Sequence, residues 1–403
     1  MNNTPESDPV VIASAARTPL GRFQGDLSGF SAPELGGFAM RAAAERSGLA
    51  FDAIDEVLMG CVLTAGIGQA PARQAALNAG LGLAIGCTTI GKVCGSGMKA
   101  TMLAHDLIVA GSSQVVLAGG MESMSNAPYL LPKARRGQRL GHGELIDSMF
   151  FDGLEDRYGA ATNGRLMGTF AEDCAEEFGF SRTAQDDFAI ESTERAQKAQ
   201  RLGLFDWETV PVPVPRRGAE ATSVSLDEQP GKANLDKIRT LAPAFRQDGT
   251  VTAANSSSIS DGAASLVLMR RSVAEQRGLK PLAIIRGHAT HAQAPARFTT
   301  APAGAIEKLW RVAGWKTSDV DLYEINEAFA VVPMAVSKLL GLPSAVVNVH
   351  GGACALGHPI GASGARIVVT LLGALRARGM RRGVASLCIG GGEATAVAIE
   401  LVE

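Results

Sequence analysis

Two cysteines in glycine-rich turns, one in each half of the chain, are the residues best placed to do chemistry. Cys94 lies in the run Val-Cys-Gly-Ser-Gly (93–97), and Cys388 begins the run Cys-Ile-Gly-Gly-Gly (388–392). A thiol that opens a helix is a candidate nucleophile, because unpaired amides and the helix dipole are expected to lower its pKa. A second thiol beside bare backbone amides is a candidate base, and those amides could hold a carbonyl oxygen.

A histidine and an asparagine in similarly tight turns could complete such a site. His358 lies between a glycine and a proline. A neutral imidazole held there could take the proton of Cys94 and later stabilise an oxyanion. Asn326 follows the apolar run 322–325, where its amide could hold a water molecule or donate to an oxyanion, and Glu327 is expected to anchor its own loop. The four side chains suggest carbon–carbon bond chemistry on a thioester.

The remaining cysteines and histidines are interpreted as structural. No Cys-x-x-Cys pair occurs in the sequence, which argues against a zinc knuckle or a dithiol redox site. We expect the other four cysteines to be inert: Cys61, Cys87, Cys174 and Cys354. The other histidines are expected to be structural or exposed, with the last the best of them for a catalytic role: His105, His142, His288, His291 and His350.

Short β-rich runs alternate with helical stretches along most of the chain. This alternation predicts largely parallel sheets covered by helices. Strands are predicted at 10–13, 56–62, 115–118, 266–269, 282–285, 322–325 and 384–388. Helices are predicted at 32–47, 98–110 and 305–312.

The order of these elements contains a weak internal repeat. In the first half a glycine-rich turn opens a helix that ends near Gly111, and the strand 115–118 follows. In the second half a turn at 361–364 opens a helix that ends near Gly379, and the strand 384–387 follows. The alternative is the generic alternation that all α/β proteins share.

The middle of the chain is more charged and less β-rich than either side. It contains a polar helix predicted at 181–201 and a proline-rich stretch at 211–215. We expect this region to be an insertion packed on the outside of the fold. Its basic run is interpreted as a solvated loop rather than a phosphate site: Lys133, Arg135, Arg136 and Arg139.

Length and composition limit the class of protein. The 403 residues, 46% apolar and 19% charged, predict two or three packed units of an ordered globular protein. The formal net charge of -2 argues against a dedicated nucleic-acid binder. No apolar stretch has membrane-spanning length, and the first eight residues lack the features of a targeting signal. We therefore expect a cytoplasmic protein with reduced thiols.

Several blocks of sequence, taken in order, resemble the motifs of the thiolase family. Any one block could occur by chance, but together they are specific, and the resemblance covers nearly the whole chain. The main blocks are Val-Cys-Gly-Ser-Gly (93–97), Asn-Glu-Ala-Phe (326–329), Gly-His-Pro-Ile-Gly-Ala-Ser-Gly (357–364) and Cys-Ile-Gly-Gly-Gly (388–392), with further thiolase-like blocks at 119–125 and 261–264.

The resemblance implies an α/β fold of two similar βαβαβαββ halves. They would form a layered α-β-α-β-α core with a loop domain inserted into the first half. The predicted halves are 1–125 with 249–280, and 281–403. The inserted domain, 126–248, would hold coenzyme A and the acyl pocket. The segment 127–146 is similar to the loop that ties thiolase dimers into tetramers, so a homotetramer is expected.

The resemblance also implies the catalytic roles. Cys94 would accept an acyl group from coenzyme A, and Cys388 would remove a proton from the methyl carbon of a second, acetyl thioester. His358 would activate Cys94 and, with a water held by Asn326, would form one oxyanion hole. The backbone amides of Cys94 and Gly390 would form the other. Ping-pong kinetics with an acyl-cysteine intermediate are expected.

Further residues are implied for support and substrate binding. Glu327 would support the geometry of Asn326 and His358. The residues expected to contact the coenzyme A thioester are Leu166, Met167, Ser257, Ser258, Ala328 and Phe329, with Lys232 in place of an arginine that often meets the nucleotide. The sequence departs from the family pattern at Gly91, at Leu166, where histidine is frequent, and at Ser258, where glycine is common. No cofactor or metal is expected, since the thioesters are substrates.

The leading hypothesis is therefore an acetyl-CoA C-acetyltransferase that condenses two acetyl-CoA molecules to acetoacetyl-CoA and also catalyses the reverse thiolysis. The close alternative is a degradative 3-ketoacyl-CoA thiolase with a broader chain-length range. A remote alternative is an inactive acyl-CoA-binding homologue, whose signature would be the loss of a catalytic residue. The pathway would be fatty acid, ketone body or polyhydroxyalkanoate metabolism.

Overall fold

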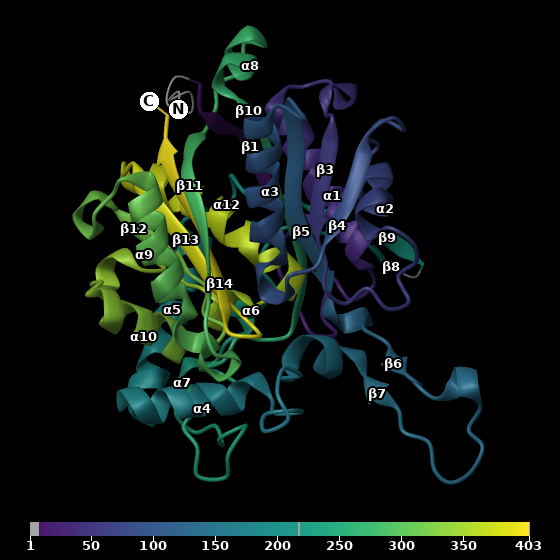
Figure 1. The fold of residues 1–403 in the computed structure, drawn as a ribbon, viewed down its shortest axis with the longest axis vertical. Helices are drawn as coiled ribbons and strands as arrows, with labels where there is room; N and C mark the ends of the chain where they lie inside the picture. Colours follow the sequence, from purple (N-terminus) through teal and green to yellow (C-terminus); the bar gives the residue numbers. More distant parts are fainter. Residues whose placement is uncertain (1–7, 217, 403) are drawn as a thin grey trace.

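The computed structural model describes residues 8–216 and 218–402, and within them ten strands form one sheet (Figure 1). The first half contributes the order β4-β3-β5-β10-β1, with β2 on β10. Its strands are β1 (Val10–Arg17), β2 (Gly21–Arg22), β3 (Glu56–Gly60), β4 (Gly86–Ile90), β5 (Val115–Ser123) and β10 (Ser260–Arg270). The second half contributes the order β12-β13-β14-β11. Its strands are β11 (Ala283–Ala292), β12 (Leu322–Ile325), β13 (Arg382–Ile389) and β14 (Glu393–Leu401).

The strand order is the same in the two halves, which confirms the predicted repeat. In the second half an isolated parallel bridge between Tyr323 and Val347 stands where β4 lies in the first. The halves are joined where β1 pairs with β11, through Val11 with Ile284 and Ile12 with Ala283.

Helices cover both outer faces and fill the space between the halves. The first half is covered by α1 (Ala32–Ser47) and α2 (Pro71–Asn78), and the second by α9 (Ala301–Ala313) and α10 (Val331–Leu340). The central layer consists of α3 (Ser96–Ala110) and α12 (Ile360–Arg378), which pack on each other and on strands of both halves (Figure 1). One apolar cluster lies between the first-half strands and their outer helices, a second surrounds α3 and α12 in the central layer, and a third lies between the second-half strands and their outer helices. The predicted α-β-α-β-α core is confirmed.

Helix α12 is the most deeply buried helix of the core. Among the described residues it is the one helix long and apolar enough to cross a membrane by length and composition, but 89% of its apolar window is buried inside the protein. Gly379 ends it in the left-handed conformation (φ 62°), which a glycine adopts without steric cost. Burial on all sides explains why its sequence is apolar all round.

The prediction of largely parallel sheets is wrong. Within the described residues the parallel pairings of the large sheet are β3 with β4, β3 with β5 and β12 with β13, and its other pairings are antiparallel. The strands read as continuous apolar runs because helices cover both faces, and burial on both faces gives this pattern whatever the strand direction. The turn at 390–392 returns β14 beside β13 as a hairpin, which must be antiparallel.

The predicted strands are all present, and the predicted helix at 32–47 has the bounds of α1. The remaining α-helices and the 3-10 turns complete the described chain. The helices are α8 (Arg271–Gln276) and α11 (Ala353–Leu356), and the 3-10 turns are Phe51–Ala53, Val93–Gly95, Met124–Asn126, Ala134–Arg136, Pro295–Thr300, Thr317–Asp319 and Ser344–Val346.

Between β5 and β10 the chain leaves the sheet and covers one end of it. This region contains β6 (Tyr129–Leu130), β7 (Ile146–Asp147), a π-helical turn (Met149–Leu154), α4 (Met167–Phe178), α5 (Arg182–Arg201), β8 (Val212–Arg216), β9 (Ala219–Val224), α6 (Glu228–Lys232) and α7 (Leu235–Ile238). Helix α5 is the predicted polar helix. The basic run lies exposed in the loop between β6 and β7, which projects away from the core (Figure 1).

Candidate active site

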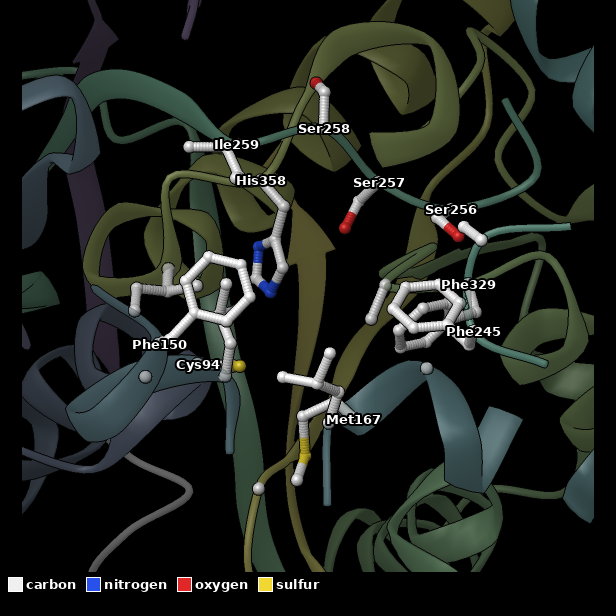
Figure 2. Close-up of a pocket in the computed structure, with 18 of the residues that line it drawn as sticks. Cys94, Phe150, Met167, Phe245, Ser256, Ser257, Ser258, Ile259, Phe329 and His358 are labelled. Carbon is white, nitrogen blue, oxygen red and sulfur yellow. The ribbon is translucent and has the colours of Figure 1, made fainter. Parts of the chain in front are cut away.

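An apolar cavity of about 350 Å³ lies where the N-terminal ends of α3 and α12 meet (Figure 2). Cys94, His358, Cys388 and Gly390 all line it. These residues come from the turns before the two central helices, from the end of β13 and from the β13–β14 turn, so the shared cavity that the sequence hypothesis requires is present. Figure 2 shows the His358 ring directed toward Cys94.

The turn that carries Cys94 is bent at a valine. Val93 has φ of 44°, an unfavourable conformation for a β-branched residue that concentrates at functional turns. The Ser96 hydroxyl holds the turn, because it accepts from the Lys92 amide at 2.8 Å and donates to the Val93 carbonyl at 2.7 Å. Helix α3 begins at Ser96, and this arrangement leaves Cys94 half-buried at the cavity wall.

Gly97, three residues after Cys94, serves the contact between α3 and α12 rather than the turn itself. A Cβ on Gly97 would lie 2.9 Å from the Gly361 carbonyl oxygen and 3.0 Å from the Ala365 amide. A Cβ on Gly364 would lie 2.8 Å from that of Met98. Any larger residue at these places would push α3 and α12 apart. The two glycine motifs therefore bring the Cys94 and His358 turns together.

The expectation that the pKa of Cys94 is lowered is wrong for the resting protein. Burial raises the pKa of this thiol to about 11, and this effect exceeds that of the Gly390 and Cys94 amides, which donate to the sulfur and lower the pKa. Cys94 is therefore a protonated thiol until a base removes its proton. Both amides are already directed at the position where charge develops.

His358 is held in the form that can act as this base. The Arg366 guanidinium lies 3.4 Å from Asn326 Oδ1, which leaves Asn326 Nδ2 to face His358 Nε2 at 3.5 Å. Because Nδ2 can only donate, we assign Nε2 as the unprotonated nitrogen. On the other side, His358 Nδ1 lies 2.5 Å from Ser363 Oγ, which donates to the Pro359 carbonyl at 3.0 Å.

Burial and the positive charge of Arg366 lower the pKa of His358 to about 3. The resting site therefore holds a thiol and a neutral imidazole. Transfer of the proton from Cys94 to His358 becomes favourable only as the thiol attacks and its charge passes to the substrate.

Cys388 lies near the end of β13 and is buried. Burial, together with the neighbouring Cys94, raises the pKa of Cys388 well above its ordinary value. The turn that follows contains Gly391 and Gly392 with φ of 94° and 82°, a conformation that favours glycine. It places Gly390 in the cavity wall, with its amide directed at the Cys94 sulfur.

Comparison with known proteins identifies the family. The sequence model described as "Thiolase, N-terminal domain" matches residues 10–272, and "Thiolase, C-terminal domain" matches residues 279–401. The chain belongs to the thiolase family. It is 52% identical over 395 residues to acetyl-CoA acetyltransferase 2 of Arabidopsis thaliana, covering 98% of this chain and 97% of that protein.

Two solved structures are similar to this thiolase over almost their whole length. The acetyl-CoA acetyltransferase of Bacillus anthracis has a TM-score of 0.94 at 41% identity, covering 98% of this chain and 99% of the other. The Acat5 thiolase of Ascaris suum, solved in complex with coenzyme A, has a TM-score of 0.91 at 42% identity, covering 98% and 100%.

Most of the predicted substrate residues lie in the cavity wall of this thiolase. They are Leu166, Met167, Ser257, Ser258, Ala328 and Phe329, and Figure 2 shows the Ser257 hydroxyl directed into the cavity. Lys232 is not part of this wall: its amine pairs with Glu228 at 2.6 Å, and the side chain is half exposed. Its proposed nucleotide contact therefore has to compete with an ion pair.

Asn326 and Glu327 lie behind the cavity rather than in it. The backbone N–H of Asn326 donates to the Ser386 carbonyl at 3.0 Å, which fixes this residue beside β13. The Glu327 carboxylate accepts from Ser192 at 2.7 Å, from Asn348 at 2.8 Å and from the Cys354 amide at 3.0 Å. Glu327 thus positions the loop that leads into the His358 turn and is not in the cavity lining.

Sequence reasoning missed the apolar walls contributed by the insertion. Phe150 and Leu154 come from the π-helical turn, and Phe245 packs edge-to-face on Phe329 at a centroid distance of 6.0 Å. The signal was the apolar run Met-Phe-Phe (149–151) inside a charged region. π-Helical turns are frequent at functional sites.

Glu122 was also missed, although it lies in a thiolase-like block. Its buried carboxylate accepts from the amides of Val62 and Leu63 at 3.1 Å and from the Gly361 amide at 2.8 Å. Burial raises the pKa of Glu122 to about 7 against the opposing effect of these donors. Glu122, which belongs to the first half, therefore caps the first turn of α12 and helps to hold the adjoining His358 turn in place.

Proposed function

We propose that this thiolase is an acetyl-CoA acetyltransferase, which condenses two acetyl-CoA molecules to acetoacetyl-CoA and coenzyme A and also cleaves acetoacetyl-CoA in reverse. The observation that carries the proposal is the arrangement of Cys94, His358, Cys388 and the Gly390 amide around one cavity. Relatives at about half identity over nearly the full chain bear that name.

In the first half-reaction Cys94 attacks the thioester carbonyl of acetyl-CoA while His358 Nε2 takes its proton. The tetrahedral oxygen sits between the amides of Cys94 and Gly390. A single such donor lowers the activation barrier by roughly 3–4 kcal/mol. The carbon–sulfur bond to coenzyme A then breaks. Cys388, protonated at rest because of its raised pKa, gives its proton to the leaving thiolate and becomes a thiolate itself.

In the second half-reaction the Cys388 thiolate takes a proton from the methyl carbon of a second acetyl-CoA. The resulting enolate attacks the acetyl group on Cys94, and a carbon–carbon bond forms as the carbon–sulfur bond to Cys94 breaks. The proton on His358 returns to Cys94, and Cys388 has regained its own. Each electron pair comes from sulfur or from the C–H bond, so the reaction balances without a cofactor or metal.

The test is to trap the covalent intermediate. Enzyme mixed with carbon-labelled acetyl-CoA and quenched in acid should carry the label on the peptide that contains Cys94. Bound acetyl-CoA without a labelled Cys94 would instead support the inactive acyl-CoA-binding homologue.

A degradative 3-ketoacyl-CoA thiolase is the second candidate, because the cavity wall beside Leu166 and Met167 is apolar and continues to Phe150 and Phe245. Thiolysis rates with acetoacetyl-CoA and with a longer 3-ketoacyl-CoA separate the two. Acetyl specificity requires the shorter substrate to be cleaved faster, and a much faster longer substrate would overturn it.

We further propose a homotetramer in the cytoplasm. The projecting loop 127–146 exposes large apolar side chains, Tyr129, Leu131, Leu140 and Leu145, as expected of an assembly surface. Leu140→Asp should yield dimers by light scattering, whereas Leu202→Asp, an exposed leucine on another surface, should leave the tetramer intact. A wild-type dimer at micromolar concentration would contradict the assembly, and cell fractionation tests the location.

A further inference from the structure

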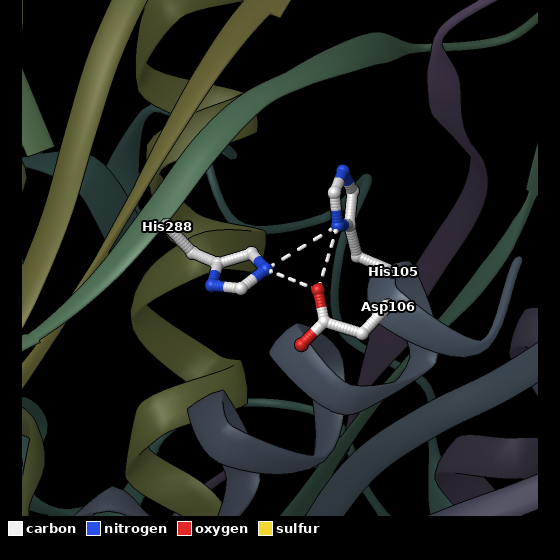
Figure 3. A group of neighbouring side chains, drawn as sticks. All are labelled: His105, Asp106 and His288. Atoms are coloured by element: carbon white, nitrogen blue, oxygen red, sulfur yellow. Dashed lines mark hydrogen bonds and ion pairs between the residues drawn. The ribbon is translucent and has the colours of Figure 1, made fainter. Parts of the chain in front are cut away.

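Two histidines and an aspartate meet on the side of the molecule where α3 faces β11 (Figure 3). His105 and Asp106 are neighbours in the third turn of α3, and His288 lies on β11. Three ligand atoms form a small triangle: His288 Nε2 lies 2.9 Å from Asp106 Oδ1 and 3.3 Å from His105 Nδ1, and the latter two atoms are 3.3 Å apart.

This triangle has the size of one face of a zinc coordination tetrahedron. Zinc binds histidine nitrogen at about 2.0–2.1 Å and carboxylate oxygen at about 2.0–2.2 Å, so neighbouring ligand atoms of a tetrahedral site lie roughly 3.3 Å apart. Two imidazoles and one carboxylate make up the ligand set of catalytic-type zinc sites, which keep the fourth position for water. The two imidazole rings are nearly perpendicular, at 86°, so both can direct a lone pair at one point.

Without a metal, N–H groups on His288 Nε2 and His105 Nδ1 can both donate to Asp106 Oδ1, at 2.9 Å and 3.3 Å. The two hydrogens then lie side by side, because the nitrogens that carry them are only 3.3 Å apart. A cation at the centre removes this crowding, because all three atoms can then act as electron-pair donors.

The site is open to an ion on one side. The histidine side chains are 19% and 17% exposed, but that of Asp106 is 51% exposed and opens the site to solvent.

We propose that His105, Asp106 and His288 bind Zn²⁺ with water as the fourth ligand. The ion ties a helix of the first half to a strand of the second. His105 lies nine residues after Ser96, the first residue of α3. Because an α-helix rises about 1.5 Å per residue, the site is about 14 Å from the start of this helix. It is therefore separate from the catalytic thiols, and its role is to brace the contact between the halves.

Cobalt(II) binding to the full-length protein, after removal of metals with a chelator, tests the site directly. We expect one Co²⁺ per chain with visible absorption bands of tetrahedral nitrogen and oxygen ligation and without the intense near-ultraviolet bands of a cobalt–thiolate bond. Zn²⁺ should displace the Co²⁺ and raise the thermal unfolding temperature.

Variants assign the binding to these residues. His288→Ala and Asp106→Asn should each weaken binding by more than the roughly 10–100-fold that loss of an outer-shell partner costs. His142→Ala, which removes an exposed histidine elsewhere, and Cys94→Ala should bind Co²⁺ as the wild type does. Two results would overturn the proposal: no tetrahedral cobalt spectrum in the wild type, or the same spectrum and affinity in folded His288→Ala.

Discussion

The two halves of this thiolase share one strand order but carry different chemistry at matching places. In the first half the turn before α3 presents Cys94, and in the second the turn before α12 presents His358. Each helix leads to a central strand, and these strands carry Glu122 in the first half and Cys388 in the second. The repeat thus supplies the scaffold, and the reaction depends on positions where the halves differ.

The halves also hold each other in an unequal way. Glu122 of the first half reaches across to cap α12 through the Gly361 amide. In the second half the equivalent strand, β13, is instead followed by Gly390, whose amide is directed at Cys94. One crossing contact supports the base, and the other supports the nucleophile. Five variants test this comparison of the two halves.

The largest effect is expected from the two thiols. Cys94→Ala should lower acyl transfer by roughly 10⁴- to 10⁶-fold, because it removes the nucleophile. Cys388→Ala should still acquire label from acetyl-CoA on Cys94, but more slowly, because coenzyme A must then leave as an unprotonated thiolate, and it should form no acetoacetyl-CoA. Mass spectrometry of quenched enzyme and a product assay measure both. Cys87→Ala, a thiol outside the cavity, is the control, and a folded Cys388→Ala that cannot be acylated would show that the two roles are misassigned.

Contact between the helix starts can be broken at Gly97. Gly97→Ala would press a methyl group on backbone atoms of α12, which cannot move aside, so we expect a loss of about 1–3 kcal/mol in stability and slower acylation. Gly29→Ala is the matched control, since its added Cβ meets nothing within 4 Å. Thermal unfolding and the acylation rate would be compared. Equal behaviour of the two variants would mean that the glycine contact does not hold the turns together.

The contact that Glu122 makes with the start of α12 can be tested by substitution. Glu122→Gln leaves one acceptor oxygen for three amide donors, so we expect a loss of about 1–3 kcal/mol and slower acylation. The pKa of Glu122 is raised in the folded protein to about 7. Its stabilising contribution is therefore complete below about pH 4.5 and is lost as the pH rises through 7.

The difference in free energy of unfolding between the wild type and Glu122→Gln should therefore become smaller as the pH rises from 4.5 to 8. Unfolding midpoints measured between pH 4.5 and 8 would show it. Glu176→Gln, on an exposed glutamate, should follow the wild type at every pH. A gap that widens with rising pH would contradict the raised pKa.

The smallest effect is expected in the loop before the His358 turn. Burial and Arg378 lower the pKa of His350 to about 4, so this histidine stabilises the fold in its neutral form, and that contribution is lost as the pH falls from about 6.5 toward 4. When the pH is lowered to 5.5, the free energy of unfolding of His350→Phe should fall by roughly 1 kcal/mol less than that of the wild type. Exposed His142→Phe should keep the acid sensitivity of the wild type, and an unchanged profile in His350→Phe would refute the assignment.

Much of the fold followed from local patterns. The bounds of α1 were predicted because its capping residue and glycine stop are local signals. Strand direction was not, because an apolar run shows burial on both faces but not which strand lies beside it. His105 and His288 were taken as structural because residues far apart in the chain carry no shared local signal.

The sequence by itself determined the reactive side chains, the order of the glycine turns around them and the repeat that builds the two halves. Only the tertiary structure decided that Cys94, His358 and Cys388 share one cavity, and that Glu122 reaches the turn of the other half. It also reversed the expected pKa shift of Cys94. The physical reason is that a helix start is encoded locally, whereas desolvation depends on everything that packs around the sulfur.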